Sequence, residues 1–276
     1  MTRQPIGVFD SGVGGLSILQ SLRAELPHED FIYIADSGHA PYGERSDAYV
    51  LARSRAVTAH LARQGVKALV IACNTATAAA IDLLRAEHPT LPIIGVEPAL
   101  KPATLLSRTR RIGVMATRST LASARFKTLL SSLAGQASFV LRPCDGLAGA
   151  IERGVHAEAG TESAAEIIAA CTRHAEAMGP FGLNDGEMDT LVLGCTHYPF
   201  AEEHLRELLG PHIQFLDTGA PVARQTRLRL AAATQDDSET QGAGQVRLFT
   251  TGQPAALQAA AQRWLQLNVA VEPLHA

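Results

Sequence analysis

The sequence has no run of about 18 uncharged apolar residues, the length that a membrane-spanning helix needs. It also has little net charge, with 24 Lys and Arg against 27 Asp and Glu, so neither nucleic acid nor an anionic membrane is an expected partner. Residues 1–9 contain neither the long apolar stretch nor the small-residue cleavage site of a signal peptide. We therefore expect a cytoplasmic protein without a membrane partner.

Cysteine is scarce too, with four residues at positions 73, 144, 171 and 195 and no Cys-x-x-Cys pair, so neither a disulfide framework nor a metal site is predicted. A glycine-rich segment, residues 10–15, lacks the lysine of a phosphate-binding P-loop. Ser17 stands where a dinucleotide fingerprint would have its third glycine. These absences disfavour a nucleotide cofactor.

The residues that are present indicate an α/β fold. At 276 residues, 46% of them hydrophobic, the chain can form two compact lobes or one large one. Short β-branched runs alternate with amphipathic stretches, as in parallel sheets with crossover helices. We predict strands at 6–9, 31–35, 68–72, 93–96, 112–115, 138–142, 190–193, 213–216 and 246–250. Helices are predicted at 16–25, 46–64, 76–87, 121–133, 161–178 and 200–209, and polar loops at 179–187 and 234–244.

A short internal repeat favours two similar lobes. The tripeptide Ile-Gly-Val occurs at 6–8 and again at 112–114, and the run at 69–73 is similar to that at 191–195. Each copy of the second run ends in a cysteine at the expected carboxyl end of a strand. Two short matches can also arise by chance in an α/β protein.

Four segments follow predicted strands and carry polar side chains: 10–15, 41–43, 73–75 and 195–199. Ligands of parallel α/β sheets bind at the carboxyl ends of strands, so these segments form the candidate site. In the first of them, Asp10 and Ser11 can face a ligand, or Asp10 can serve only as a helix cap beside glycines that allow close packing.

Cys73 and Cys195 are the candidate acid/base groups. A single cysteine at a strand end is more often a small buried apolar residue. Here two occur in matched settings, before Asn74 and before Thr196, and a helix N-terminus or a nearby histidine favours a thiolate. Two similar groups on opposite faces of a carbon atom can invert its configuration by proton transfer. We assign Cys144 and Cys171 to packing.

At these segments the sequence resembles the glutamate racemases of the aspartate/glutamate racemase superfamily. The resemblance rests on residues 7–16, 40–43, 72–76 and 193–199, in that order, and spans nearly the whole chain. It implies two α/β lobes with the ligand in the cleft between them. The second lobe (98–212) is inserted into the first (1–97, completed by 213–276). The resemblance also implies a cofactor-independent reaction that supplies D-glutamate for peptidoglycan synthesis, and it allows a homodimer.

The resemblance also implies residue roles. Cys73 takes the proton from D-glutamate and Cys195 takes it from L-glutamate, with Asp10 and His197 assisting. The substrate contacts would be made by Asp10, Ser11, Tyr42, Gly43, Asn74, Thr75, Thr196 and His197, with Pro41, Thr117, Thr120 and Glu152 as further candidates. For Glu152, a solvated charge at a helix end is the more common interpretation. No arginine lies in the four segments, so backbone amides and Ser, Asn and Thr side chains are expected to bind the substrate carboxylates.

Other functions remain open from the sequence. An aspartate or hydantoin racemase, or a decarboxylase with one catalytic cysteine, would share this scaffold. The paired cysteines disfavour the decarboxylase, and the segments at 10–12 and 195–198 favour glutamate. A non-catalytic amino-acid-binding protein would not need two cysteines in matched positions.

Overall fold

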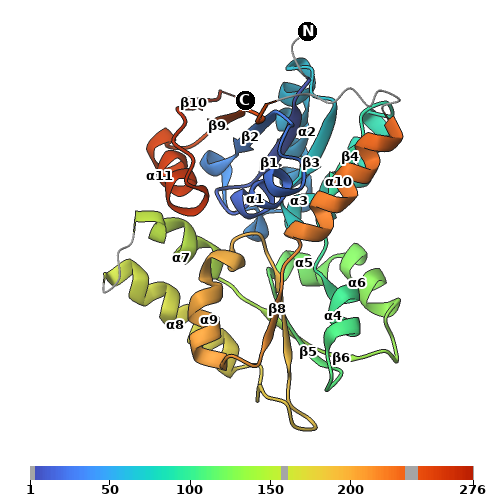
Figure 1. The fold of residues 1–276 in the computed structure, drawn as a ribbon, viewed down its shortest axis with the longest axis vertical. Helices are drawn as coiled ribbons and strands as arrows, with labels where there is room; N and C mark the ends of the chain where they lie inside the picture. Colours follow the sequence, from blue (N-terminus) through green and yellow to red (C-terminus); the bar gives the residue numbers. More distant parts are fainter. Residues whose placement is uncertain (1–3, 157–160, 234–241, 276) are drawn as a thin grey trace. The chain divides into compact units, whose positions relative to one another are not determined.

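The computed structural model describes residues 4–156, 161–233 and 242–275. The chain divides into two compact units, Met1–Val96 with Gly219–Ala276, and Glu97–Thr218. Each unit holds a parallel sheet flanked by helices, which confirms the predicted fold class (Figure 1). Most of the predicted loop at 234–244 lies outside the described residues.

The first unit contains a six-stranded parallel sheet in the order β10-β9-β2-β1-β3-β4. Its strands are β1 (Ile6–Asp10), β2 (Phe31–Ala35), β3 (Ala68–Ile71), β4 (Ile93–Gly95), β9 (Val246–Thr250) and β10 (Val271–Pro273). The first three are buried at every residue, as expected for strands that are covered on both faces. Residues 10, 36 and 73 lie at or just after the carboxyl ends of these strands, and therefore at the same end of the sheet.

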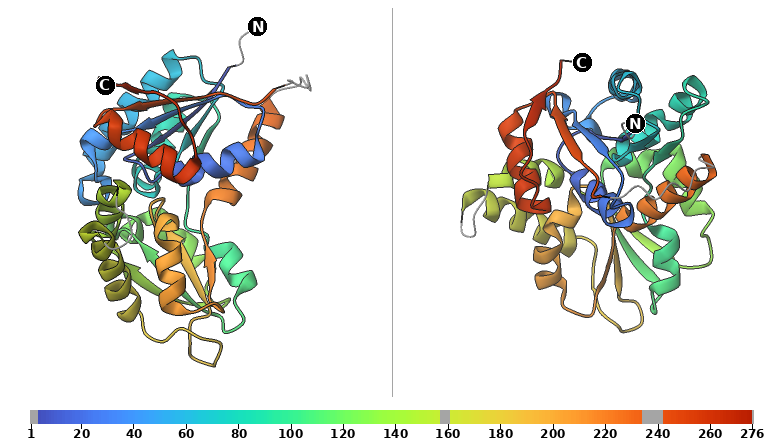
Figure 2. Two further views of the ribbon diagram at one scale, coloured as in Figure 1. Left: turned by 60° about the vertical axis from the view of Figure 1, so that its left-hand side comes forward. Right: turned by 45° about the horizontal axis from the view of Figure 1, so that its top comes forward.

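Helices cover both faces of this sheet (Figures 1 and 2). Helices α2 (Asp47–Arg63) and α3 (Asn74–Glu87) pack together on one face, over a core that includes Phe9, Leu61 and Ile71. On the other face α1 (Leu16–Glu25) packs against both α10 (Gly219–Ala233) and α11 (Pro254–Leu265). Two short 3-10 helices, η1 (Ser37–His39) and η2 (Tyr42–Glu44), follow β2.

The second unit contains a four-stranded parallel sheet in the order β6-β5-β7-β8. Its strands are β5 (Arg111–Ala116), β6 (Ser138–Pro143), β7 (Thr190–Gly194) and β8 (Gln214–Leu216). Its helices are α4 (Leu100–Leu106), α5 (Arg118–Ala122), α6 (Ala124–Ser131), α7 (Leu147–Arg153), α8 (Glu162–Glu176) and α9 (Glu202–Leu209), with η3 (Gly154–His156) and η4 (Tyr198–Ala201). Residues of α4 and α6 pack with the sheet in one core cluster.

The internal repeat is visible in the strand order and register. The order β2-β1-β3-β4 of the first sheet matches β6-β5-β7-β8 of the second. Gly7 lies opposite Leu69 on the neighbouring strand, and Gly113 lies opposite Leu191. The two tripeptides and the two cysteine-terminated runs therefore occupy equivalent positions in the two units, and this equivalence supports their interpretation as a repeat.

The structure differs from the sequence predictions in a few places. The second unit ends at Thr218 rather than at 212, because β8 pairs with β7 and thus belongs to the second sheet. The helix predicted at 121–133 is split, since Ser123 ends α5 and its side chain caps α6. Four helices (α4, α7, α10 and α11) and strand β10 were not predicted. Within the described residues, no helix is both long and apolar enough to span a bilayer.

Candidate active site

Cys73 is held at the start of a helix in the first unit. It follows β3 directly, has extended backbone angles and acts as the N-cap of α3, where its sulfur accepts a hydrogen bond from the Ala76 amide at 3.4 Å. Its side chain is 5% exposed. The partial positive charge of the α3 N-terminus favours the thiolate over the thiol, so this position suits a sulfur that exchanges protons.

A short chain of polar groups connects Cys73 to Asp10. The thiol of Cys73 donates to Ser11 Oγ at 3.7 Å, and Ser11 Oγ lies 3.3 Å from Asp10 Oδ1. Asp10 also accepts hydrogen bonds from the Ser11 and Gly15 amides, at 2.7 and 2.5 Å, so it closes the turn before α1. Asp10 is fully buried. Asp10 thus binds the amide of Gly15, which is the N-cap residue of α1, and it also contacts Ser11, whose Oγ accepts from the Cys73 thiol.

Gly15 permits this turn by close approach. A Cβ atom at this position would lie 2.6 Å from Asp10 Cβ and 2.9 Å from the Tyr33 hydroxyl oxygen. Both neighbours are buried, and the Tyr33 hydroxyl donates to the Gly12 carbonyl at 2.8 Å. Any larger residue would thus push the carboxylate away from the turn.

Asn74 follows Cys73 and is 5% exposed. Among the described residues, neither its amide nitrogen nor its amide oxygen has a hydrogen-bond partner. A buried amide without partners is unusual in a native protein, because it loses its hydration without replacement. Asn74 is the first residue of α3 and directly follows Cys73, so this amide without partners stands at the start of the helix that Cys73 caps. Thr75, the next residue of α3, is also buried.

Tyr42 lies in a turn that is held by a hydrogen bond to Asp36, a contact that the sequence did not predict. The Tyr42 hydroxyl donates to Asp36 Oδ2 at 2.5 Å, and burial together with the Asp36 carboxylate raises the pKa of this phenol far above its usual range. Its hydroxyl is thus committed to Asp36, and the exposed Pro41 and half-buried Gly43 present the turn to solvent. We expected Tyr42 to contact substrate; in the structure its side chain is 1% exposed and packs in the core of the first unit.

Asp36 is a buried carboxylate that accepts several hydrogen bonds, and the sequence did not predict this role. It accepts two hydrogen bonds from Arg53, at 2.9 and 3.0 Å, and one from Thr251 Oγ1 at 2.8 Å, in addition to that from Tyr42. Hydrogen bonding to Asp36 raises the pKa of Arg53. The available signal was its position, since Asp36 directly follows β2 just as Asp10 ends β1.

In the second unit, Cys195 follows β7 and has a different setting. It precedes the four-residue 3-10 helix η4, and its sulfur lies 3.8 Å from His197 Nδ1. His197 Nε2 in turn lies 3.2 Å from Glu152 Oε2, which comes from α7. Glu152 is therefore a partner of His197 and not a solvated helix-end charge. The repeat places a cysteine in each unit, but an imidazole–carboxylate pair replaces the α-helix N-terminus in the second.

The partners of His197 change the pKa of its imidazole. Burial alone would lower the pKa of the imidazole, but its hydrogen bonds with Cys195 and Glu152 raise it well above the usual value. A protonated imidazole beside the sulfur favours negative charge on Cys195.

The remaining candidates in the second unit are hydroxyl groups. Thr117 caps α5, accepts from the Thr120 amide at 3.2 Å and has its Oγ1 2.8 Å from Thr120 Oγ1. By the register of the repeat, Thr117 corresponds to Ser11 and Thr196 to Asn74. Thr120 and Thr196 are buried. The structure therefore brings Thr117 and Thr120 together at the end of β5, in the position that Ser11 has after β1.

Cys144 and Cys171 differ from the two candidate cysteines. Burial raises the pKa of the Cys144 thiol far above its usual range and that of Cys171 to about 12. Cys144 Sγ donates to the Arg142 carbonyl at 3.4 Å. Both thiols therefore stay protonated near neutral pH, which supports their assignment to packing. No cluster of three or more His, Cys, Asp or Glu side chains suited to a metal ion occurs among the described residues.

Comparison with known proteins identifies the family. The family model for Asp/Glu/Hydantoin racemase matches residues 15–226. The chain belongs to the Asp/Glu/hydantoin racemase family. Among curated members, the glutamate racemase of Herpetosiphon aurantiacus is 46% identical over 92% of this chain and 95% of its own length. That of Stutzerimonas stutzeri is 49% identical over 82% of each chain.

Crystal structures of family members have the same fold. The glutamate racemase isoform RacE1 of Bacillus anthracis superposes with a TM-score of 0.83 at 29% identity, covering 100% of this chain and 98% of its own. The Escherichia coli glutamate racemase, in complex with L-glutamate and the activator UDP-MurNAc-ala, gives the same TM-score and identity over 99% and 98% of the two chains. Curated family members named glutamate racemase are isomerases, so this racemase-family chain is an isomerase as well.

Proposed function

We propose that this chain interconverts L- and D-glutamate by proton transfer at Cα, with Cys73 and Cys195 as the two acid/base groups and without a cofactor. The observation that carries the proposal is the repeat. Each unit places a cysteine after an equivalent strand, and each sulfur has a partner that favours the thiolate. Relatives named glutamate racemase, at 46% and 49% identity, support glutamate as the substrate.

Two thiols, each with its own group that favours the thiolate, suit the reversible inversion of configuration at Cα. Removal of a proton from one face of Cα must be followed by delivery from the other face, and the reverse reaction exchanges these roles. Cys73, supported by the N-terminus of α3, accepts the proton of D-glutamate. Cys195, supported by His197, accepts that of L-glutamate. In each direction the other sulfur starts as a thiol and delivers its proton.

Polar groups next to each sulfur bind the substrate. In the first unit these are Asn74, whose amide has no partner among the described residues, Thr75 and Ser11. In the second unit Thr196 lies next to Cys195, and Thr117 occupies the position that corresponds to Ser11. These groups and nearby backbone amides supply hydrogen bonds to two carboxylates and an ammonium group. Asp10 and Glu152 act through Ser11 and His197.

The cellular role follows from the product. We propose that the chain supplies D-glutamate for peptidoglycan synthesis in the cytoplasm, and that it acts on a small-molecule substrate as a homodimer. These proposals rest on the family and on the sequence, which favours neither nucleic acid nor a membrane as partner.

The direct test is a circular-dichroism assay with both enantiomers of glutamate and of aspartate. The chain should convert each glutamate enantiomer to the same racemic mixture, because enantiomers have equal free energy in water, and aspartate should react far more slowly. The reaction should survive dialysis against EDTA. Equal turnover of aspartate would contradict the substrate assignment, and loss of activity that a divalent ion restores would contradict the cofactor-free mechanism.

A further inference from the structure

Thr77 is a buried residue of α3 that takes no part in the proton transfers described above. It lies one helical turn after Cys73, and its backbone amide donates to the Cys73 carbonyl at 2.8 Å. Thr77 is 1% exposed, so the partners of its hydroxyl must come from the protein interior.

The Thr77 hydroxyl joins the ends of two neighbouring strands. Its Oγ1 donates to the carbonyl of Ile71, the last residue of β3, at 3.3 Å. The same oxygen accepts a hydrogen bond from the amide of Val96, which directly follows β4, at 3.1 Å. Strands β3 and β4 are paired, with Ile71 opposite Gly95. One hydroxyl therefore connects the first turns of α3 to the carboxyl ends of both strands.

The methyl group of Thr77 packs closely against β4. A Cβ atom at Gly95 would lie 2.5 Å from Thr77 Cγ2 and 2.5 Å from Ile81 Cδ1. Helix α3 can approach β4 this closely because residue 95 is glycine. The contact leaves little space for the start of α3 to shift toward β4.

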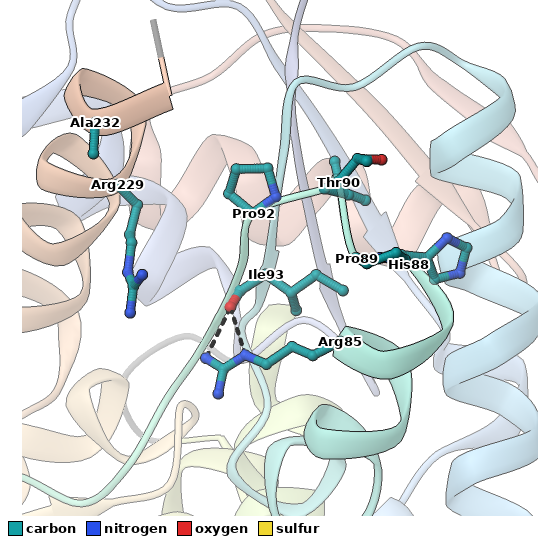
Figure 3. A pocket seen from close by; sticks show the side chains of 9 residues that line it. Arg85, His88, Pro89, Thr90, Pro92, Ile93, Arg229 and Ala232 are labelled. Carbon is teal, nitrogen blue, oxygen red and sulfur yellow. Dashed lines mark hydrogen bonds between the residues drawn. The ribbon is translucent and has the colours of Figure 1, made fainter.

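Helix α3 is also attached to β4 at its other end. There Arg85 Nε and Nη2 donate to the carbonyl of Ile93, the first residue of β4, at 3.1 and 2.8 Å (Figure 3). A helix of 14 residues is about 20 Å long, so this attachment is remote from Cys73. The attachment through Thr77 fixes the end of α3 that Cys73 caps.

We propose that Thr77 is a positioning residue for Cys73. This inference rests on the proposed function, in which the Cys73 sulfur accepts the Cα proton of D-glutamate. The sulfur is held by the Ala76 amide, and the hydroxyl of the next residue ties that part of α3 to β3 and β4. Proton transfer needs an accurately placed sulfur, so loss of this hydroxyl slows proton removal from the D enantiomer.

The test measures chloride release from the D and L forms of 3-chloroglutamate, which needs only removal of the Cα proton. Thr77→Val keeps the branched shape of the side chain and removes the hydroxyl, whereas Thr77→Ser keeps the hydroxyl and removes the methyl group. Thr77→Val should lower kcat for the D form about tenfold or more, because small displacements of a reacting group have large effects. A general change in substrate binding would affect both forms. The L form, whose proton goes to Cys195, should therefore keep its kcat within about threefold, and Thr77→Ser should keep both forms within about threefold of the unmodified chain.

Thr226→Val is a matched control. Thr226 is also fully buried in the first unit, and its hydroxyl donates to the Val222 carbonyl within α10 at 2.8 Å. This variant should leave both elimination rates within about threefold of the unmodified values. Hydrogen exchange of the Val96 amide, followed by NMR, should become faster in Thr77→Val, where the amide has lost its acceptor, and should not change in Thr226→Val.

Several outcomes would overturn the proposal: equal slowing of both forms in Thr77→Val, no slowing, the same loss in Thr77→Ser, or unchanged exchange at Val96. If the valine variant does not fold, Thr77→Ala removes the same hydroxyl with a smaller side chain and should give the same difference between the two forms. Failure of the proposed function has a different result, since the Cys73→Ala chain would then still release chloride from the D form.

Discussion

Replacing Glu152 by Gln is a sensitive test of how the second unit controls its sulfur. The substitution keeps the shape of the side chain and removes the negative charge that lies 3.2 Å from His197 Nε2. The raised pKa of His197 depends in part on that charge. With a neutral neighbour the pKa of His197 falls, and the imidazolium that favours a Cys195 thiolate becomes less populated.

The size of the effect follows from the geometry. An opposite charge within about 4–6 Å shifts a pKa by about 1–3 units. The Glu152 side chain is 26% exposed, so solvent screens part of the interaction and the lower end of this range applies. A shift of one pKa unit corresponds to about 1.4 kcal/mol, which is a factor of about ten in the equilibrium between the imidazolium–thiolate pair and its neutral form.

The assay must isolate one proton transfer. Because the two enantiomers have equal free energies, kcat/KM must change equally in both directions for any variant. Racemisation rates therefore cannot show whether a substitution slows proton removal from only one enantiomer. Elimination of chloride from 3-chloroglutamate needs only removal of the Cα proton. The Glu152→Gln variant should release chloride from the L form about tenfold more slowly than the unmodified chain does. Its rate with the D form should stay within about twofold of the unmodified rate.

A matched variant controls for loss of an unrelated carboxylate. Glu166→Gln, on α8, removes an exposed charge that pairs with Arg153, and it should leave both eliminations unchanged. If Glu152→Gln slows both enantiomers equally, or neither of them, the Glu152–His197–Cys195 chain does not control the second sulfur.

Three further predictions concern stability and binding. Asn74→Ala should lower kcat/KM for glutamate at least tenfold while the free energy of unfolding in urea falls by less than about 1 kcal/mol, because the buried amide has no partner among the described residues. Asp36→Ala should lower the free energy of unfolding by about 3 kcal/mol or more, since it removes the buried carboxylate that accepts hydrogen bonds from Arg53, Tyr42 and Thr251. The pKa of His197 is raised on folding, so its contribution is complete below the unfolded value of about 6.5 and is lost as pH rises through the folded value. The stability difference between the unmodified chain and Glu152→Gln, followed by urea denaturation, should therefore be larger at pH 6 than in alkaline solution.

The sequence predicted the fold where local patterns are strong. Every described strand except β10 was predicted, because buried parallel strands form continuous β-branched runs. Strand β10 has only three residues and ends at Pro273, so its pattern is too short to recognise. Helix α4 has seven residues and contains Pro102, and α7, also of seven residues, starts after Gly146. Strand order came from pairings between distant segments, which local patterns do not encode.

The candidate site was predictable as a set of positions but not as a set of contacts. The repeat and the strand ends pointed to Cys73 and Cys195. That the first sulfur caps α3 while the second contacts His197 required the structure, because both cysteines precede polar residues in the sequence. Glu152 lies 45 residues from His197, and no local pattern links the two. The hydrogen bonds of Asp36 were not predicted because its partners come from η2, α2 and the residue after β9, which are distant in sequence.

The two-thiol mechanism is tested most directly by removing each sulfur in turn. Cys73→Ala and Cys195→Ala should both lose racemisation in both directions, since each direction needs both groups. Cys144→Ala and Cys171→Ala should stay within a few-fold of the unmodified chain and serve as controls.

The decisive measurement is chloride release from the two forms of 3-chloroglutamate by these variants. Cys73→Ala keeps the base that faces the L form and should process only that form, and Cys195→Ala should process only the D form. If either variant still racemises glutamate at near the unmodified rate, or if each variant eliminates chloride from both forms, the assignment of one thiol to each face of Cα is wrong.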